Sequence, residues 1–189
     1  WARGGFETPL GVAPIDEQLA ARLLQAETWI RDDPEAHRAE HSLEMQLPFL
    51  QHLVADLRIV PALMGTQSRE EVARLARALA AAVPPQREVL LVASSDLSHY
   101  HPAPRANALD AKVVGDVERF DPGALMDRLE ADRGHACGGG PMVAVMRAAR
   151  ELGAARSQVL RYADSGDAGE RDKSRVVGYL AAAFIAAAP

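Results

Sequence analysis

Residues 94–99, with the sequence Ser-Ser-Asp-Leu-Ser-His, combine side chains that can move protons or bind a metal. They directly follow the aliphatic run 89–93, which indicates a buried strand, and open α/β sheets carry their sites beyond the carboxyl ends of such strands. The spacing of Asp96 and His99 places a carboxylate and an imidazole on one side of a turn, which suits proton transfer or metal ligation. In the alternative interpretation the polar residues cap a turn and His99 is an ordinary surface residue.

A second segment, residues 135–141, carries the chain's single cysteine, Cys137, in front of three glycines and Pro141. Pro141 is suited to the first position of a helix, so we expect Cys137 just ahead of a helix amino end, where thiolate is favoured over thiol. A thiolate is a metal ligand or a nucleophile, and glycines allow a close approach to a ligand or an anion. The alternative is a buried, inert cysteine in a flexible turn.

A third segment, residues 40–48, contains Ser42 as a candidate helix cap and Glu44 in the first turn of that helix. His41 and Glu44 would face the same way and could line a pocket. Helix capping by itself explains most of this pattern.

The remaining elements alternate along the chain. Apolar spacing, acidic caps and prolines predict helices over 16–25, 42–55, 68–82, 105–118, 122–130 and 141–152, with Pro48 as a candidate kink. Aliphatic runs predict strands over 58–64, 89–94, 159–162 and 176–183. Strands separated by helices predict an α/β fold with a mostly parallel or mixed sheet and helices on both faces. We expect residues 1–189 to form one domain.

Composition narrows the class of protein. The 189 residues are 48% hydrophobic with a net charge of −5, and no segment concentrates lysine and arginine, so neither nucleic acid nor a membrane is an expected partner. One cysteine excludes an internal disulfide framework and favours the reducing cytoplasm.

Taken together, four segments closely resemble the Memo family, also named for protein B of the AmmeMemoRadiSam system. They are residues 40–49 (Glu-His-Ser-Leu-Glu-Met-Gln-Leu-Pro-Phe), 94–100 (Ser-Ser-Asp-Leu-Ser-His-Tyr), 136–141 (Ala-Cys-Gly-Gly-Gly-Pro), and 162–167 (Tyr-Ala-Asp-Ser-Gly-Asp) continuing through 174–179 (Ser-Arg-Val-Val-Gly-Tyr). The resemblance runs from about Phe6 to Phe184 in the family's order.

The resemblance implies an α/β fold shared with class III extradiol dioxygenases and a mononuclear iron or copper site built from two histidines and a cysteine. Cys137 matches the cysteine ligand, and Asp96 and His99 match an aspartate and a third histidine beside the metal. By the same resemblance His41 and Glu44 are at most pocket-lining. Implied partners are AMMECR-type and radical-SAM proteins or a peptide ligand.

The chain departs from the family pattern at its amino-terminal side. The family carries its two ligand histidines in an amino-terminal portion, in a Pro-His-Ala-Gly-Tyr element and a later Ser-His element. Neither of these amino-terminal elements occurs here, and the sequence begins at Trp1. We therefore expect the carboxyl-terminal two thirds of a Memo-like protein, with weak or absent metal binding by this chain alone. An uncovered sheet edge should favour association, including homo-oligomers.

Two functional hypotheses follow. In the first, the intact protein is a metal-dependent oxidoreductase in which Cys137 holds the metal. His99 then moves protons or contacts a bound oxygen species, and Asp96 orients His99 or a metal-bound water. In the second, the site handles metal, or binds a peptide or protein, without turnover.

Overall fold

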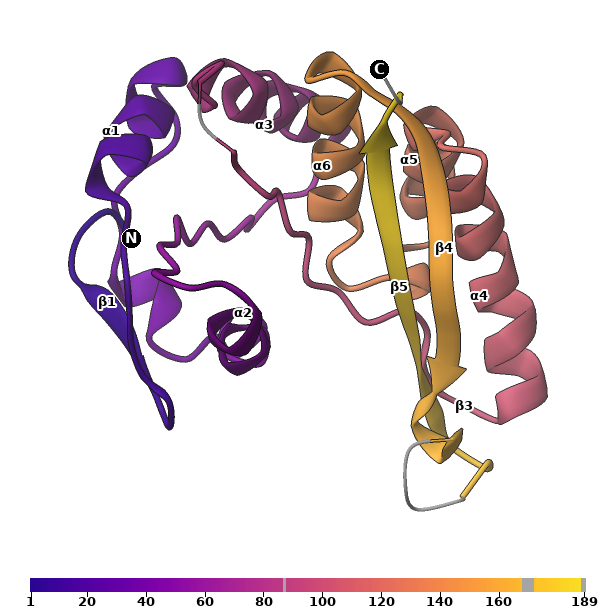
Figure 1. Cartoon of the computed structure of the whole chain (residues 1–189). Coiled ribbons are helices and arrows are strands. Elements are labelled where there is room, and N and C mark those ends of the chain that lie inside the picture. The colour runs from indigo at the N-terminus through magenta and orange to yellow at the C-terminus, as the bar shows by residue number, and fades with distance from the viewer. Residues whose placement is uncertain (87, 168–171, 188–189) are drawn as a thin grey trace. The chain divides into compact units, whose positions relative to one another are not determined.

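The computed structural model describes residues 1–86, 88–167 and 172–187 (Figure 1). The backbone groups into two compact units, Trp1–Gly65 with Ala81–Leu90, and Thr66–Ala80 with Leu91–Pro189. That the whole chain forms one domain stays a prediction.

The first unit opens with an antiparallel hairpin and a capped helix. Strands β1 (Gly5–Thr8) and β2 (Gly11–Pro14) pair with Gly5 opposite Pro14. Helix α1 (Glu17–Ala26) begins where the Asp16 carboxylate accepts the backbone N–H of Leu19 at 2.9 Å, which confirms the predicted acidic cap. The hydrophobic core of this unit joins Phe6, Ala13 and Leu47, with Trp1, Leu57 and Ile59 packed against them.

Two predictions for the first unit are wrong. Helix α2 covers only Leu47–Leu53, after turns over 42–46, so Ser42 does not cap it and Pro48 lies in its first turn rather than at a kink. A proline in the first helical turn is tolerated because its missing N–H needs no partner there. The expected strand over 58–64 is reduced to one parallel bridge between Ile59 and Ile15. An aliphatic run forms a strand only where a neighbouring strand pairs with it, and here the pairing stops at that bridge.

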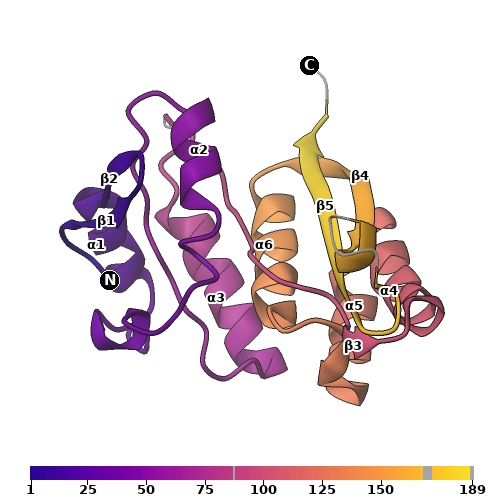
Figure 2. The same cartoon turned by 90° about the horizontal axis from the view of Figure 1, so that it is seen from below.

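The second unit packs helices against antiparallel strands (Figure 2). Its helices are α3 (Arg69–Ala82, whose last two residues group with the first unit), α4 (Ala103–Glu118), α5 (Pro122–Ala131) and α6 (Gly139–Glu151). Strands β3 (His99–His101), β4 (Ala154–Asp164) and β5 (Val176–Ala186) form a sheet in the order β3-β5-β4. Short 3-10 turns lie at Arg133–His135 and Ser165–Asp167 in this unit, and at Glu35–His37 in the first unit. Helices α4 and α6 both pack against the long β4–β5 ribbon (Figure 1).

The α/β class is confirmed, with a sheet that is not strictly parallel. The strand ladders in the described residues are antiparallel, and parallel pairing is limited to the bridge at Ile59. The predicted buried strand over 89–94 is wrong: these residues carry no strand or bridge, and Leu90 and Val92 are 75% and 50% exposed. An aliphatic run becomes a strand only where a neighbouring strand accepts its hydrogen bonds.

The helices of the second unit are held by apolar burial and one buried carboxylate. Leu125, Met126, Val143 and Met146 are almost wholly buried. Asp116 on α4 is wholly buried and pairs with Arg119 at 2.5 Å and with Arg128 at 2.6 Å. None of the helices in the described ranges has the length and hydropathy of a membrane span.

Candidate metal centre

The segment that carries Asp96 and His99 is anchored to β5 in the second unit. The backbone N–H of Leu97 donates to the carbonyl of Gly178 at 2.9 Å, and the N–H of Gly178 donates to the carbonyl of Ser98 at 3.0 Å. His99 then begins β3 opposite Val177. This short pairing does the positioning that the sequence assigned to a longer strand before Ser94.

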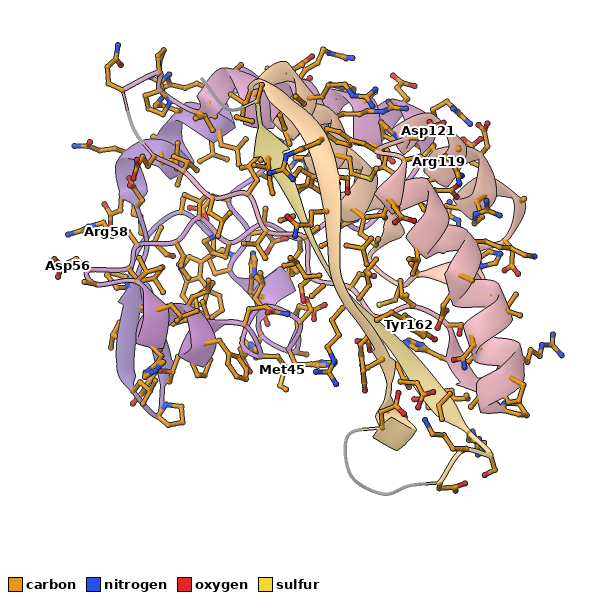
Figure 3. The ribbon with its side chains drawn as sticks, turned by 45° about the vertical axis from the view of Figure 1, so that its right-hand side comes forward. Met45, Asp56, Arg58, Arg119, Asp121 and Tyr162 are labelled. Carbon is orange, nitrogen blue, oxygen red and sulfur yellow. The ribbon has the colours of Figure 1, made fainter. Side chains whose placement is uncertain are left out.

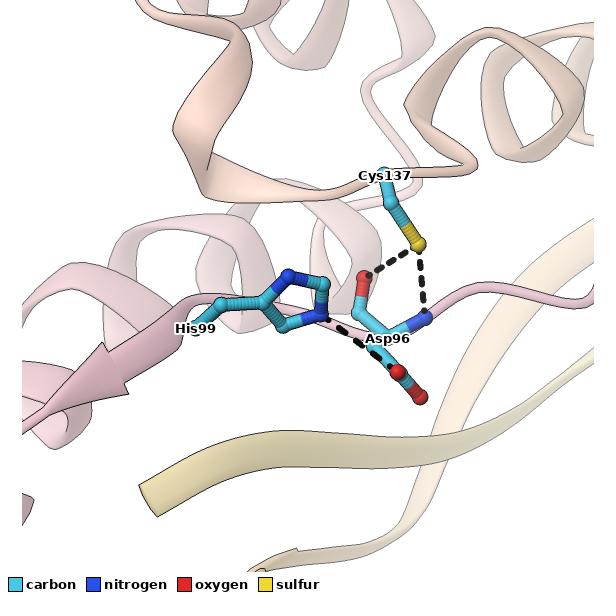
Figure 4. A group of neighbouring side chains, drawn as sticks. All are labelled: Asp96, His99 and Cys137. Carbon is cyan, nitrogen blue, oxygen red and sulfur yellow. Dashed lines mark hydrogen bonds and ion pairs between the residues drawn. The ribbon is translucent and has the colours of Figure 1, made fainter. Parts of the chain in front are cut away.

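Asp96, His99 and Cys137 converge (Figure 4). Each offers one ligand atom, and these three atoms lie within 4.8 Å of one another, a grouping found among the described residues only here. The backbone N–H of Asp96 donates to Cys137 Sγ at 3.3 Å, and the N–H of Cys137 donates to the carbonyl of Asp96 at 3.3 Å. The two segments that carry the triad are therefore joined directly through their backbones.

His99 Nε2 is the unsatisfied atom of this triad. It lies 3.4 Å from Asp96 Oδ2, yet the geometry is not that of a hydrogen bond, and the nitrogen is buried from solvent without a hydrogen-bond partner among the described residues. Buried polar atoms almost always have a hydrogen-bond partner. Within the described ranges His99 Nε2 has only the ion-pair contact with Asp96, so it can still accept a bond from a ligand.

The cysteine loop reaches the triad through a close backbone contact. An added Cβ on Gly138 would lie 2.8 Å from the Cβ of Ser95, and the N–H of Gly138 donates to Ser95 Oγ at 2.9 Å. The sequence predicted that Pro141 is the first residue of helix α6. The helix begins at Gly139, so Pro141 is its third residue. Cys137 is exposed, which excludes the buried, inert alternative.

Gln67 closes the same loop from the other side. Its Nε2 donates to the carbonyl of Cys137 at 3.0 Å, and its Oε1 accepts the N–H of Gly140 at 2.7 Å. One amide side chain thus spans the loop that presents the thiol. Nothing in the local sequence signals this role, because Gln67 and Cys137 are 70 residues apart.

The donor set fits a transition metal. Sulfur and imidazole nitrogen suit copper, zinc and iron, and the carboxylate oxygen suits iron. Because His99 Nε2 lacks a partner and the three donor atoms lie within 4.8 Å, an ion could engage them together without displacing an existing side-chain hydrogen bond of His99.

Comparison with known proteins identifies the family of the chain. The family model described as "Memo-like protein" matches residues 1–183. The chain belongs to this Memo-like family. It is 37% identical to a MEMO1 family protein of Methanosarcina mazei, over 95% of this chain and 67% of the relative. It is 38% identical to another of Methanothermobacter thermautotrophicus, over 94% of this chain and 64% of the relative.

A Sulfolobus acidocaldarius relative is similar over 97% of this Memo-like chain, at 36% identity, and the match covers 65% of the relative. The chain spans about two thirds of the length of the curated relatives it matches. The resemblance drawn from the sequence motifs is therefore confirmed as family membership.

The structure of this Memo-like chain brings together three of the five predicted site residues. Asp96, His99 and Cys137 form the triad, and their individual roles stay predictions. His41 and Glu44 lie in the first unit, both exposed, at and just after the start of the turns before α2, and their pocket-lining role stays a prediction as well.

Two tyrosines beside the triad were not assigned a role from the sequence. Partial burial, together with the charge of Asp96, raises the pKa of Tyr179, which follows Gly178 on β5. Tyr100 lies at an irregularity of the β3–β5 ladder with φ +61°, and its ring contacts His99 at 5.5 Å between centroids. Both lie in the family motifs, and Tyr100 directly follows His99 in the sequence.

Proposed function

We propose that this Memo-like chain carries part of a mononuclear iron or copper centre of an oxidoreductase, with Cys137 as ligand and Asp96 and His99 as the groups that act beside it. The observation that carries the proposal is the triad itself, in which sulfur, nitrogen and carboxylate oxygen lie within 4.8 Å and the nitrogen has no hydrogen-bond partner. A bound iron or copper ion would supply redox chemistry to a substrate.

The residues of the chain have separable tasks in this proposal. Cys137 presents its sulfur from a loop that Gln67 holds at both ends, so the ligand is preorganised. His99 holds or moves a proton at Nε2, and Asp96 Oδ2, at 3.4 Å, orients that ring. The backbone N–H of Asp96 supports the sulfur at 3.3 Å.

Binding by this chain alone is expected to be weak. The family resemblance places two ligand histidines in elements that this sequence lacks, so the chain would offer fewer ligands than the intact site. In this proposal Cys137 binds the ion weakly and stoichiometrically in this chain, with Asp96 and His99 beside it, and the intact protein binds the ion tightly.

The test is an anaerobic titration of the purified chain with cobalt(II). Cobalt(II) reports sulfur ligation through a thiolate-to-metal absorption band, and plasma mass spectrometry of the iron(II)-loaded chain measures the stoichiometry. We expect the band to saturate at one ion per chain, to vanish in Cys137→Ser and to require higher metal concentrations in His99→Ala.

His101→Ala is the matched control, because His101 lies on the same strand β3 but outside the triad. It should bind cobalt(II) as the unchanged chain does. A titration without a band at any cobalt(II) concentration, or a band that survives Cys137→Ser, would overturn the proposal.

The second candidate is metal handling without turnover. Cys137 is exposed, and the side chains of Asp96 and His99 are 48% and 37% exposed, so a bound ion could exchange with solvent. Dioxygen uptake by the iron(II)-loaded chain that Cys137→Ser lacks supports the oxidoreductase. Rapid loss of the ion to a chelator without dioxygen uptake supports metal handling.

A further inference from the structure

A buried carboxylate lies directly behind the triad. Asp110 on α4 is wholly buried, its Oδ1 accepts the backbone N–H of Ser98 at 3.0 Å, and its Oδ2 accepts the hydroxyl of Tyr162 at 2.8 Å. Tyr162 reaches it from β4, on the side of that strand that faces α4 (Figure 3). Burial and the hydrogen bond to Asp110 raise the pKa of Tyr162, so the phenol remains a donor at neutral pH.

The Ser98 N–H needs this acceptor. Leu97 and Ser98 pair with Gly178 on one side through the Leu97 N–H and the Ser98 carbonyl. The N–H of Ser98 is not part of that pairing, and Ser98 is wholly buried, so water cannot satisfy it. Asp110 therefore completes the hydrogen bonding of the backbone between Asp96 and His99.

The surrounding residues make room for the carboxylate. A Cβ on Gly178 would overlap Asp110 Oδ2 and lie 2.8 Å from Asp110 Cγ, so the close approach of α4 to β5 depends on glycine. Asn107 lies one turn earlier on α4, and its Oδ1 is a second acceptor for the Tyr162 hydroxyl at 2.9 Å. Segments from two strands, one helix and the triad-bearing segment thus meet at Asp110.

Asp110 differs from the other buried carboxylate of the same helix. Asp116 is equally buried but pairs with Arg119 at the end of the same helix and with Arg128 on α5, so its interactions link α4 to α5. No ion pair of Asp110 is found in the described part of the chain; its hydrogen bonds go to the triad-bearing segment and to Tyr162.

We infer that Asp110 is a positioning residue of the proposed metal centre. Its hydrogen bond to the Ser98 N–H holds the segment that carries Asp96 and His99 in place beside Cys137. Tyr162 orients the Asp110 carboxylate, and the absence of a side chain at Gly178 leaves room for it. The inference rests on the proposed function for its consequence in metal binding. It also assigns a role to residues 162 and 178 of the family motifs, which the proposed function leaves unexplained.

The test compares Asp110→Ala, Asp110→Asn and Asp116→Asn by cobalt(II) titration at a temperature where circular dichroism shows each variant folded. Asp110→Ala should weaken binding by about 10- to 100-fold, as removal of groups that support metal ligands does. Asp110→Asn should restore most of the affinity, since its amide oxygen can accept the Ser98 N–H while its amide nitrogen donates to Tyr162. Asp116→Asn should lose stability but bind as before.

A second measurement separates this inference from the proposed function. In amide NMR spectra without metal, Asp110→Ala should shift the resonances of Asp96 and Cys137 and increase hydrogen exchange at Ser98, and Asp116→Asn should not. If the unchanged chain binds no cobalt(II) while these shifts occur, the proposed function fails and the positioning role stands. Unshifted triad amides, or equal effects of the Asp110 and Asp116 variants, would overturn the positioning role.

Discussion

Replacing Gly178 by alanine adds one methyl group where the structure has no room for it. The new Cβ would overlap Asp110 Oδ2, lie 2.8 Å from Asp110 Cγ and lie 3.2 Å from the Cβ of Leu97. The backbone cannot easily yield, because the N–H and carbonyl of Gly178 are both bonded to the triad-bearing segment. Overpacking of this kind costs about 1–3 kcal/mol.

If the Asp110 carboxylate moves aside instead, the Ser98 N–H loses its acceptor, whereas the Tyr162 hydroxyl can still donate to Asn107 Oδ1. An unsatisfied buried donor costs about 1–3 kcal/mol, so either response leads to an expected loss of about 1–3 kcal/mol. That is a large part of the roughly 5–15 kcal/mol of a typical domain.

The assay is urea unfolding followed by two probes. Both tryptophans, Trp1 and Trp29, belong to the first unit, and the three tyrosines belong to the second, so fluorescence and tyrosine absorbance report the two units separately. We expect Gly178→Ala to lower the urea midpoint seen by tyrosine absorbance. Gly65→Ala is the matched control, because a Cβ there meets nothing within 4 Å, and it should change stability by less than about 0.5 kcal/mol.

A double variant tests the cause. In an Asp110→Ala background the clash with the carboxylate is absent, so the further cost of Gly178→Ala should be smaller than in the unchanged chain by about 1–2 kcal/mol. Equal midpoints for Gly178→Ala and Gly65→Ala, or strictly additive effects in the double variant, would refute the reasoning.

Three further predictions follow from the same unit. Gln67→Ala removes both clamps of the cysteine loop and should destabilise the unit by about 1–3 kcal/mol and weaken cobalt(II) binding; unchanged binding would exclude a role for the clamp in presenting Cys137. Tyr100 has φ +61°, so Tyr100→Gly should be more stable to urea than Tyr100→Ala by about 1 kcal/mol, and the reverse order would show that the backbone is not strained. Burial holds the pKa of His135 below its ordinary 6.5, so unfolding releases a group that binds protons more readily. Stability should therefore fall as pH drops below about 6.5, and His135→Gln should flatten that fall in urea midpoints measured between neutral and mildly acidic pH; an identical pH profile would contradict the burial effect.

The helices were largely predictable because their signals are local. Asp16 before α1, Ser68 before α3, and the apolar spacing over 105–118 and 122–130 all lie within or next to the helix they specify. The predicted start of α2 was five residues too early, and the predicted start of α6 was two residues too late. Both helices carry a proline in the first turn, and a proline there does not fix which residue comes first.

The strands were less predictable because each needs a partner. The run 176–183 became part of β5 since β4 lies beside it, whereas the similar runs 58–64 and 89–93 have no ladder among the described residues. All of these runs are rich in aliphatic residues, so aliphatic content alone could not distinguish them.

The motifs in the sequence were enough to identify the family and to nominate Asp96, His99 and Cys137. The order of the four motifs along the chain indicated the family, whereas the spacing of Asp96 and His99 and the loop around Cys137 each left an alternative open. Only the tertiary structure decided what holds them: Gln67 against the Cys137 loop, and Asp110 between Ser98, Tyr162 and the space left by Gly178. These contacts join residues far apart in the chain, through single hydrogen bonds and one missing methyl group, and no local pattern of residues encodes such a meeting.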